Sequence, residues 1–383
     1  MKIDGKNGLR TWIEVDRRAI AHNYKLFRSL ISKKTKLMAV VKSNAYGHSL
    51  IDFSREMERL GADWLGVDSI VEALALRREG TRFPVLVLGY TFPDRFKEAT
   101  EKNISLTVST FETLSAIEKM KLPKPLQVHI KVDTGMHRQG FLAKDLPTIL
   151  ADLQHTTHNR QLKIEGLYTH FANAKNPAFP QDTNNQLAEF SKWQAASKKS
   201  GLKPICHVAA TAGTILFPDS HYDMVRVGIG LYGLWPDSEI RSFASNRLIL
   251  RPVLSWKSVV SEIKKVPKGE RVGYGLSEEL TRDSTLAVVP IGYWHGYPRF
   301  LSSVGWTLVS GHRAKVVGRV SMDMIVIDIT GIKGVKPQDE VVLIGRQGKE
   351  SISIDTDLAG LSDFSYNYEF VTRINPLIKR IYV

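Results

Sequence analysis

The chain has 383 residues, of which 43% are hydrophobic and 24% charged, a composition typical of a folded globular protein large enough for two domains. Its net charge of +14 is spread over short groups such as Lys33-Lys34 and Lys264-Lys265, and no basic arm that would favour a nucleic-acid partner is present. Residues 1–10 are polar, and no stretch approaches the ~18 apolar residues of a membrane span, so we expect a cytoplasmic protein with no membrane partner. The single cysteine, Cys206, excludes an intrachain disulfide.

After Asp16, which can cap a helix, apolar residues recur at helical spacing up to Ile31. Strands and helices then alternate. The predicted strands cover residues 37–41, 64–67, 85–88, 104–108, 127–132, 164–168, 205–209 and 224–229. Predicted helices lie between them, and Ser69 with Glu72 and Ser109 with Glu112 have the spacing of capping boxes.

Eight such units favour an α/β fold with an N-terminal (α/β)8 TIM-like barrel over residues 12–240. An open doubly wound sheet is the alternative, but no glycine-rich dinucleotide turn follows the first strand. Beyond Pro236, runs rich in Val, Ile and Thr predict a mostly β C-terminal domain over residues 241–383. Whether residues 1–15 pack with that second domain stays open.

The stretch VVKSNAYGH, residues 40–48, places Lys42 directly after the first strand. Barrel enzymes carry their chemistry at the carboxyl ends of their strands. A lysine near apolar packing loses its proton more readily and can act as an amine nucleophile or form a Schiff base. The alternative is an ordinary exposed loop lysine, and other residues must decide between the two.

Further polar groups follow strands of the same predicted barrel. Lys131 lies at the end of the fifth strand, Arg138 follows it, and His170 follows the sixth. Arg226 lies in the eighth, before small residues whose N–H groups a phosphate could approach. In the β domain, Tyr274 stands between two glycines. Taken singly, His170 could be a core histidine, Tyr274 a hairpin aromatic and Arg226 an ion-pair partner of a nearby aspartate.

Together these segments resemble the alanine racemase family, fold-type III enzymes dependent on pyridoxal 5′-phosphate. The most specific matches are residues 41–48, 133–138, 168–171, 321–323 and 367–369, and the resemblance extends from about Trp12 to Tyr382. It implies an isomerase that interconverts L-alanine and D-alanine and supplies D-alanine for cell-wall peptidoglycan.

The resemblance implies that Lys42 binds the cofactor covalently and that Lys42 and Tyr274 are the two catalytic bases. Racemisation takes the α-proton from one face and returns one on the other, which two groups on opposite faces achieve. Tyr274 would come from the partner subunit of a homodimer, and His170 and Arg226 would support it, because a phenol has an ordinary pKa of about 10. Arg226 would also donate to the pyridine nitrogen of the cofactor, which must then stay unprotonated, and this limits side reactions such as transamination.

The remaining site residues also follow from the resemblance. The cofactor phosphate would be held by Tyr46, Thr211, Gly228, Ile229 and Tyr368. Arg138 would orient the cofactor phenolate and contact the substrate, Lys131 matches a lysine that is often carbamylated, and Met322 and Asp323 match residues near the substrate carboxylate. We expect no metal.

Three positions depart from the family pattern: Ala210 stands where asparagine is usual, His295 where aspartate is usual, and Ser321 where cysteine is common. They leave a serine or broad-specificity racemase open as an alternative. A non-catalytic pyridoxal phosphate-binding protein is a second alternative, against which Tyr274 speaks. A decarboxylase on a related barrel is less favoured, because such proteins resemble this chain poorly around Lys42.

Overall fold

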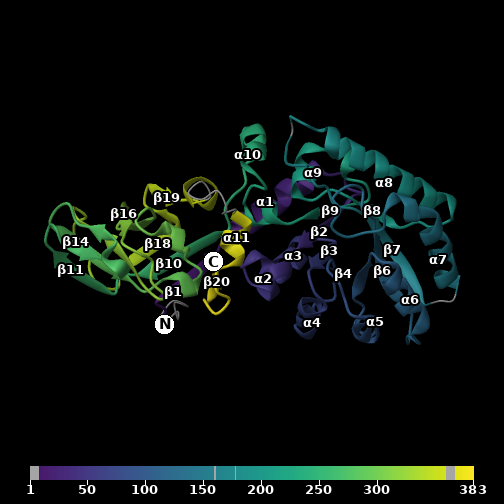
Figure 1. The fold of residues 1–383 in the computed structure, drawn as a ribbon, viewed down its shortest axis with the longest axis horizontal. Coiled ribbons are helices and arrows are strands. Elements are labelled where there is room, and N and C mark those ends of the chain that lie inside the picture. The colour runs from purple at the N-terminus through teal and green to yellow at the C-terminus, as the bar shows by residue number, and fades with distance from the viewer. Residues whose placement is uncertain (1–7, 159–160, 177, 359–366) are drawn as a thin grey trace. The chain divides into compact units, whose positions relative to one another are not determined.

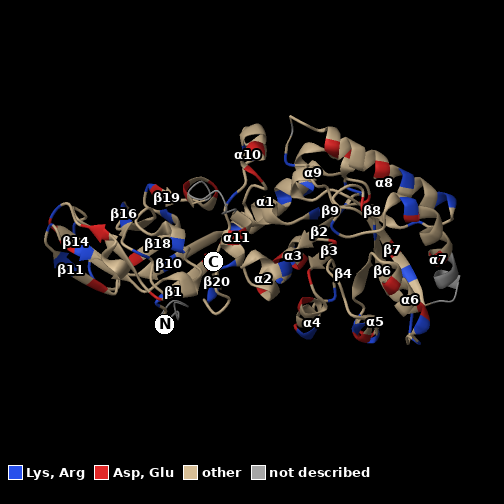
Figure 2. Ribbon diagram, in the orientation of Figure 1, with Lys and Arg blue, Asp and Glu red and all other residues tan. Residues whose placement is uncertain are grey.

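The computed structural model describes residues 8–158, 161–176, 178–358 and 367–383 (Figure 1). The chain divides into two compact units, a barrel unit of residues 20–45 and 50–251 and a β unit of residues 1–19, 46–49 and 252–383. Lys and Arg residues are distributed over elements of both units (Figure 2). No helix in the described ranges is long and apolar enough to cross a membrane.

The barrel unit is built on eight parallel strands that pair in the order β8-β7-β6-β5-β4-β3-β2-β9. These strands are β2 (Lys36–Val40), β3 (Trp64–Val67), β4 (Val85–Val87), β5 (Ser105–Val108), β6 (Leu126–Lys131), β7 (Leu162–Tyr168), β8 (Ile205–His207) and β9 (Met224–Val227). Across the remaining gap between β8 and β9, Asp223 N donates to Cys206 O at 3.0 Å and Arg226 N to Ala209 O at 2.9 Å. The predicted TIM-like barrel is therefore confirmed, and the open doubly wound sheet is wrong.

Helices connect the strands of this barrel. They are α1 (Arg17–Leu30), α3 (Leu50–Leu60), α4 (Ile70–Arg78), α5 (Phe96–Glu101), α6 (Phe111–Lys119), α7 (Leu146–His158), α8 (Gln181–Lys199), α9 (Thr211–Leu216) and α10 (Ser238–Ala244), with short 3-10 turns at η1 (Pro93–Arg95), η2 (Ala143–Asp145), η3 (Pro218–Ser220) and η4 (Ile229–Tyr232). Asp16 accepts N–H groups from the first turn of α1, and Ser69 accepts from Glu72 N at the start of α4. The predicted cap at Ser109 is wrong: Thr110, in an extended conformation directly before α6, is the N-cap residue.

The β unit confirms the prediction of a second, mostly β fold. Its main sheet has the order β11-β14-β17-β16-β15-β18-β10-β1-β20, with β19 paired to β18, and β12 and β13 form a separate ribbon. The strands are β1 (Thr11–Val15), β10 (Leu254–Val259), β11 (Glu262–Val266), β12 (Arg271–Val272), β13 (Glu278–Glu279), β14 (Ser284–Val289), β15 (Trp306–Val309), β16 (His312–Val317), β17 (Ile325–Asp328), β18 (Glu340–Gln347), β19 (Glu350–Ile352) and β20 (Arg380–Tyr382). Short helical segments are η5 (Tyr274–Leu276), η6 (Tyr293–His295), η7 (Arg299–Leu301), the π-helical η8 (Ile354–Leu358) and α11 (Asn367–Thr372). The N-terminal strand β1 pairs with β10 and β20.

Topology alone brings four of the predicted site residues to one end of the barrel. Lys42 directly follows β2 after Val41, Lys131 is the last residue of β6, His170 follows β7, and Arg226 lies near the end of β9. In a parallel barrel the carboxyl ends of all strands open on the same face, where barrel enzymes carry their chemistry. Residues far apart in the sequence thus meet in one place.

Candidate active site

Lys42 begins a turn whose backbone is left-handed. Ser43, Asn44, Ala45 and Tyr46 have φ angles of 56°, 54°, 50° and 50°, and none of them is glycine. A left-handed conformation costs an L-residue roughly 1–2 kcal/mol because its Cβ approaches the following carbonyl oxygen. Such a run persists only where its surroundings hold it, and strained backbone of this kind is concentrated at functional sites.

Glu72 of α4 holds the barrel side of this turn. Its Oε1 accepts from Asn44 N at 3.2 Å and its Oε2 from Asp68 N at 2.9 Å. The Lys42 amine lies 3.4 Å from Asp68 Oδ1, and 38% of its side chain is exposed. The Glu72 carboxylate therefore joins the segment that carries Lys42 to the segment that carries Asp68. The sequence predicts only a helix-capping role for Glu72.

Arg226 is buried at the same end of the barrel and makes five hydrogen bonds. Its Nη1 donates to Nδ1 and to the carbonyl oxygen of His207, at 3.0 and 2.9 Å. Its Nη2 donates to His170 Nδ1 at 3.1 Å and to the carbonyl oxygens of Thr169 and Val208 at 2.8 and 3.0 Å. These partners, rather than an aspartate, fix the guanidinium, and burial lowers the pKa of Arg226 to about 10.

The guanidinium determines which ring nitrogens of its histidine neighbours carry protons. Arginine has only donors, so Nδ1 of both His170 and His207 must accept, and the ring proton of each neutral ring is on Nε2. His207 Nε2 then donates to His129 Nδ1, 2.8 Å away inside the barrel. Burial, with the charge of Arg226 next, lowers the pKa of His170 and His207 well below the ordinary value and that of His129 to about 3.

The sequence alone predicts no role for His129 and His207. His129 precedes Lys131 by two positions on β6, and residues two apart on a strand point to the same side. That periodicity could have placed its ring inside the barrel with the lysine. Its pairing with His207 joins segments 78 residues apart, which local patterning does not encode.

Lys131 is the most deeply buried lysine of this end of the barrel, with 6% of the residue exposed. Its Nζ donates to Gln139 Oε1 at 2.8 Å and lies 5.4 Å from the centre of the Tyr168 ring. Burial first, then the charges of Arg226 and Arg138, lower the pKa of Lys131 to about 8. Roughly a tenth of this amine is therefore neutral at pH 7, far more than for a lysine with the ordinary pKa of 10.5.

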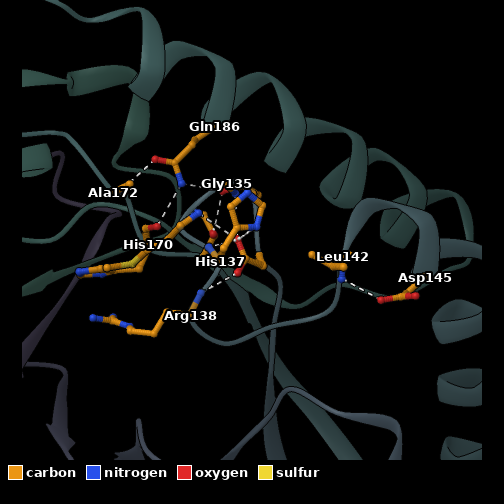
Figure 3. A network of polar contacts seen from close by, with 12 residues as sticks. Gly135, His137, Arg138, Leu142, Asp145, His170, Ala172 and Gln186 are labelled. Atoms are coloured by element: carbon orange, nitrogen blue, oxygen red, sulfur yellow. Dashed lines mark hydrogen bonds and ion pairs between the residues drawn. The ribbon is translucent and has the colours of Figure 1, made fainter.

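Asp133 shapes the loop that carries Arg138 (Figure 3). Its Oδ1 accepts from the N–H groups of Gly135, Met136 and His137 at 2.9, 3.0 and 3.0 Å, and its Oδ2 accepts from Arg138 N at 3.1 Å. Burial alone would raise the pKa of Asp133, but these backbone donors outweigh it and the net shift is downward. An ionised side chain thus fixes four consecutive residues.

Thr211, Gly228 and Ile229 come together at the ends of β8 and β9. Gly228 N donates to Thr211 Oγ1 at 3.1 Å, and Ile229 begins the 3-10 turn η4. Ala210, one of the departures from the family pattern, is the N-cap residue of α9 and makes no side-chain hydrogen bond there. A hydroxyl and backbone N–H groups are donors of the kind that bind a phosphate.

The other predicted site residues belong to the β unit. The Tyr46 and Tyr368 rings pack with centres 6.1 Å apart, and Gly47 allows this segment to approach closely, because a Cβ there would lie 2.1 Å from Val371 O. Tyr274 is 71% exposed between Gly273 and Gly275, whose φ angles of 80° and 72° suit glycine.

Two departures from the family pattern lie in neighbouring loops of the β unit. Tyr293 N donates to Ser321 O at 3.1 Å, and Trp294 N donates to Met322 O at 3.0 Å. His295 Nδ1 accepts from Gly292 N at 3.2 Å and lies 4.0 Å from Asp323 Oδ1. His295 and Ser321 therefore sit beside the two residues that the resemblance places near the substrate carboxylate.

Known proteins match both units of the chain. The family model described as alanine racemase, N-terminal domain, matches residues 15–236, and that described as alanine racemase, C-terminal domain, matches residues 253–382. The chain belongs to the alanine racemase family. The alanine racemase of Methanococcus maripaludis is 38% identical over 375 residues, covering 97% of this chain and 98% of the relative, and that of Symbiobacterium thermophilum is 38% identical over 385 residues, covering 100% and 99%.

Solved structures of alanine racemases share the fold over nearly the whole chain. The enzyme from Bacillus anthracis with bound L-Ala-P has a TM-score of 0.90 and 35% identity, covering 98% of this chain and 95% of that one. The enzyme from Bartonella henselae with covalently bound pyridoxal phosphate has a TM-score of 0.84 and 27% identity, covering 98% and 100%. Alanine racemases are isomerases, and the family depends on pyridoxal phosphate.

The barrel end suits that cofactor chemically. Lys42, Lys131, Arg138 and Arg226 lie close enough for their charges to act together on His170. Such a group of cations favours an anionic ligand, and the phosphate and phenolate of pyridoxal phosphate are anions. The amine of Lys42 is the type of nucleophile that an aldehyde requires.

Proposed function

We propose that this protein interconverts L-alanine and D-alanine with pyridoxal 5′-phosphate, by exchange of the α-proton between two bases. The observation that carries the proposal is the barrel end, where the amine of Lys42, on a side chain that is 38% exposed, shares the electrostatic field of Lys131, Arg138 and Arg226. This arrangement supplies an amine for an aldehyde and positive charge for the anionic groups of the cofactor and the substrate.

In this proposal Lys42 binds the cofactor covalently, and His170, Arg138 and Arg226 surround the cofactor. The phosphate of the cofactor would be held by Tyr46, Thr211, Gly228, Ile229 and Tyr368. When bound, pyridoxal phosphate withdraws electrons from the α-carbon of the amino acid and so makes the α-proton more acidic. Arg226 remains a donor toward every partner, and we infer that its fixed charge restricts the reaction to proton exchange.

The two bases would be Lys42 Nζ and Tyr274 Oη, each holding or releasing the proton on one face of the α-carbon. Tyr274 would come from the partner subunit of a homodimer. Its exposure between two glycines suits a side chain that enters the site of another subunit. Met322 and Asp323 of the same β unit, together with Arg138, would then act on the substrate carboxylate. His170 and Arg226 would support the phenol of Tyr274 as a base.

Lys131 would act as a carbamate rather than as an amine. Its lowered pKa leaves a neutral Nζ that can attack carbon dioxide, forming a C–N bond while one proton leaves to water, and the product is an anion. That anion would reduce the repulsion among the surrounding cations and could orient Arg138. We further propose that the protein works in the cytoplasm and supplies D-alanine for peptidoglycan.

A serine or broad-specificity racemase remains the second candidate, because His295 and Ser321 lie beside Met322 and Asp323. Polarimetry with L-alanine, L-serine and larger L-amino acids separates the two candidates. Racemisation of alanine alone supports the first, and a comparable rate with serine supports the second. If the cofactor-loaded protein exchanges no α-proton of any amino acid in heavy water, a non-catalytic binding protein is the correct description.

The placement of the two bases can be tested by combining chains. Lys42→Ala and Tyr274→Phe chains carrying different affinity tags are co-expressed, and the mixed dimers are isolated. If Tyr274 acts in the partner's site, one of the two sites holds both intact groups, and the mixed dimer has about half of the wild-type activity.

The matched control pairs a wild-type chain with a chain carrying both substitutions. Under the proposal, each site of this control dimer lacks one group, so it is inactive. If the two groups instead act within one chain, the pattern is reversed: the control dimer is half active and the first mixed dimer is inactive. That reversed result would refute the proposed homodimeric site.

A further inference from the structure

Gln186 bridges two loops at the carboxyl end of the barrel. It lies on α8, and its side-chain amide makes three hydrogen bonds (Figure 3). Nε2 donates to Thr134 Oγ1 and to His170 O, both at 3.2 Å, while Oε1 accepts from Ala172 N at 2.8 Å. Only 4% of the residue is exposed. Both amide hydrogens and the amide oxygen therefore have partners.

The two bridged loops carry Arg138 and His170. Thr134 follows Asp133, whose carboxylate fixes the backbone as far as Arg138. His170 accepts from Arg226 through Nδ1. A hydroxyl contact of 2.9 Å between Thr134 and Thr169 joins the loops directly, and Gln186 adds a second connection from the helix. Loss of the amide would remove the connection to α8, and the spacing of Arg138 and His170 would then depend on the Thr134–Thr169 contact and on the preceding backbone bond from Val132 N to Tyr168 O, at 2.9 Å.

Anchoring of α8 does not require this amide. Phe190 and Trp193, on the same helix, are 0% and 1% exposed and attach it to the barrel by apolar packing. This buried amide uses both of its donors and its oxygen on two loops. The fixed geometry that it gives them explains its presence better, because buried polar groups cost free energy unless they are satisfied.

We propose that Gln186 is a positioning residue for racemisation, holding the Arg138 loop and the His170 segment at a fixed separation. This inference rests on the proposed function for the roles of Arg138 and His170. A displacement of about 1 Å in such groups can cost up to roughly a hundredfold in rate without loss of folding.

The test compares Gln186→Met, which keeps the side-chain length and removes all three hydrogen bonds, with Gln181→Met on the same helix. Gln181 is exposed and bonds only to Asn185 among the side-chain contacts that the described residues show. In the cofactor-loaded enzyme, Gln186→Met should lower kcat about tenfold, with KM for alanine changed less than about twofold. The control should match wild type.

A second measurement does not depend on activity. His170 is partly buried and faces four cations, Arg226, Arg138, Lys131 and Lys42. If its segment loosens and admits water, its ring should titrate at higher pH in Gln186→Met than in wild type, as followed by ¹⁵N NMR and assigned by its absence from His170→Gln. A merely structural loss at α8 would lower the melting temperature without moving this titration.

Gln186→Glu provides the second variant, because it keeps an acceptor for Ala172 N and removes the two donors. It should lower kcat in the same way, and kcat decides the question if Gln186→Met does not fold, because the added carboxylate raises the pKa of His170 by its charge alone. Unchanged kcat and an unchanged His170 titration in a folded variant would overturn the proposal. Should wild type fail to racemise alanine, the proposed function fails, and the NMR comparison still tests Gln186.

Discussion

The barrel end and the β unit hold their proposed site residues in opposite ways. In the barrel unit, Arg226 is buried and fixed by five hydrogen bonds, and Lys131 is only 6% exposed. In the β unit, Tyr274 is 71% exposed and Met322 53% exposed. A single chain thus fixes the barrel groups in its interior, whereas the groups of the β unit are exposed on its surface.

This difference predicts how substitutions divide between stability and activity. Groups in the barrel form part of a buried polar network, so altering them changes the free energy of unfolding as well as the rate. Exposed groups of the β unit contribute little to folding, so altering them should change the rate alone. The following measurements test this division, beginning with the largest expected effect.

Tyr274→Phe should lower kcat by about 10²- to 10⁴-fold, because it removes a proposed proton-transfer group. Since the residue is 71% exposed, the free energy of unfolding should change by less than about 0.5 kcal/mol. Tyr90→Phe, at an exposed tyrosine of the barrel unit, is the control and should leave the rate unchanged. A Tyr274→Phe rate within threefold of wild type would contradict its role as a base.

Asp133→Asn should lower both stability, by about 2 kcal/mol, and kcat, because one charged acceptor holds four N–H groups. Denaturant unfolding of this variant and of Asp145→Asn, whose carboxylate accepts from Leu142 N in an exposed turn, measures the difference.

The pH dependence follows from the lowered pKa of Asp133 in the folded chain. Its carboxylate stabilises the fold above the ordinary pKa of 3.8, and the benefit is lost as the pH falls through the lower folded-state pKa. The stability difference between wild type and Asp133→Asn should therefore shrink in acid, and a constant difference would count against this account.

Lys131→Met should raise the free energy of unfolding by about 1–2 kcal/mol at pH 7 in buffer free of carbon dioxide. Protonated Lys131 is unfavourable in the fold, where its pKa is about 8, while the unfolded chain keeps the ordinary value of 10.5. Between these values the unfolded chain binds more protons, so wild-type stability rises with pH and the difference between the proteins disappears. Lys163→Met, at an exposed lysine paired with Glu165, should show no such dependence.

Met322→Ala should have the smallest effect, about a threefold rise in KM with stability unchanged within about 0.5 kcal/mol. Met324→Ala is a closely matched control, since both methionines are 53% exposed and lie on the same loop. Equal KM values for the two variants would remove Met322 from the proposed substrate contacts.

Local patterns in the sequence predicted most of the barrel. Its strands are short apolar runs separated by helical periodicity, and each predicted strand overlaps an observed one, with Trp64–Val67 reproduced at both ends. The position of Lys42 after the first of these strands follows from the same local signals. The N-cap at Thr110 was missed because a neighbouring serine has the same capping chemistry.

Partners distant in the sequence could not be predicted in this way. Gln186 contacts Thr134 from 52 residues away, and His129 contacts His207 from 78 residues away. A glutamine on an amphipathic helix has no feature that identifies its partners, which depend on how helix and barrel pack. The left-handed turn after Lys42 was also missed, because the segment Ser43-Asn44-Ala45-Tyr46 contains no glycine to signal it.

The left-handed turn after Lys42 also bears on the order in which the chain folds and binds its cofactor. Four left-handed residues cost roughly 1–2 kcal/mol each, a large part of the 5–15 kcal/mol that usually separates folded from unfolded chains. A nascent or partly folded chain lacks the surroundings that offset this cost, so we expect Lys42 to reach its final position only late in folding. We expect cofactor capture in a refolding time course to coincide with the last folding phase; capture in an earlier phase would show that the turn forms independently. Covalent attachment would then mark chains whose barrel is complete.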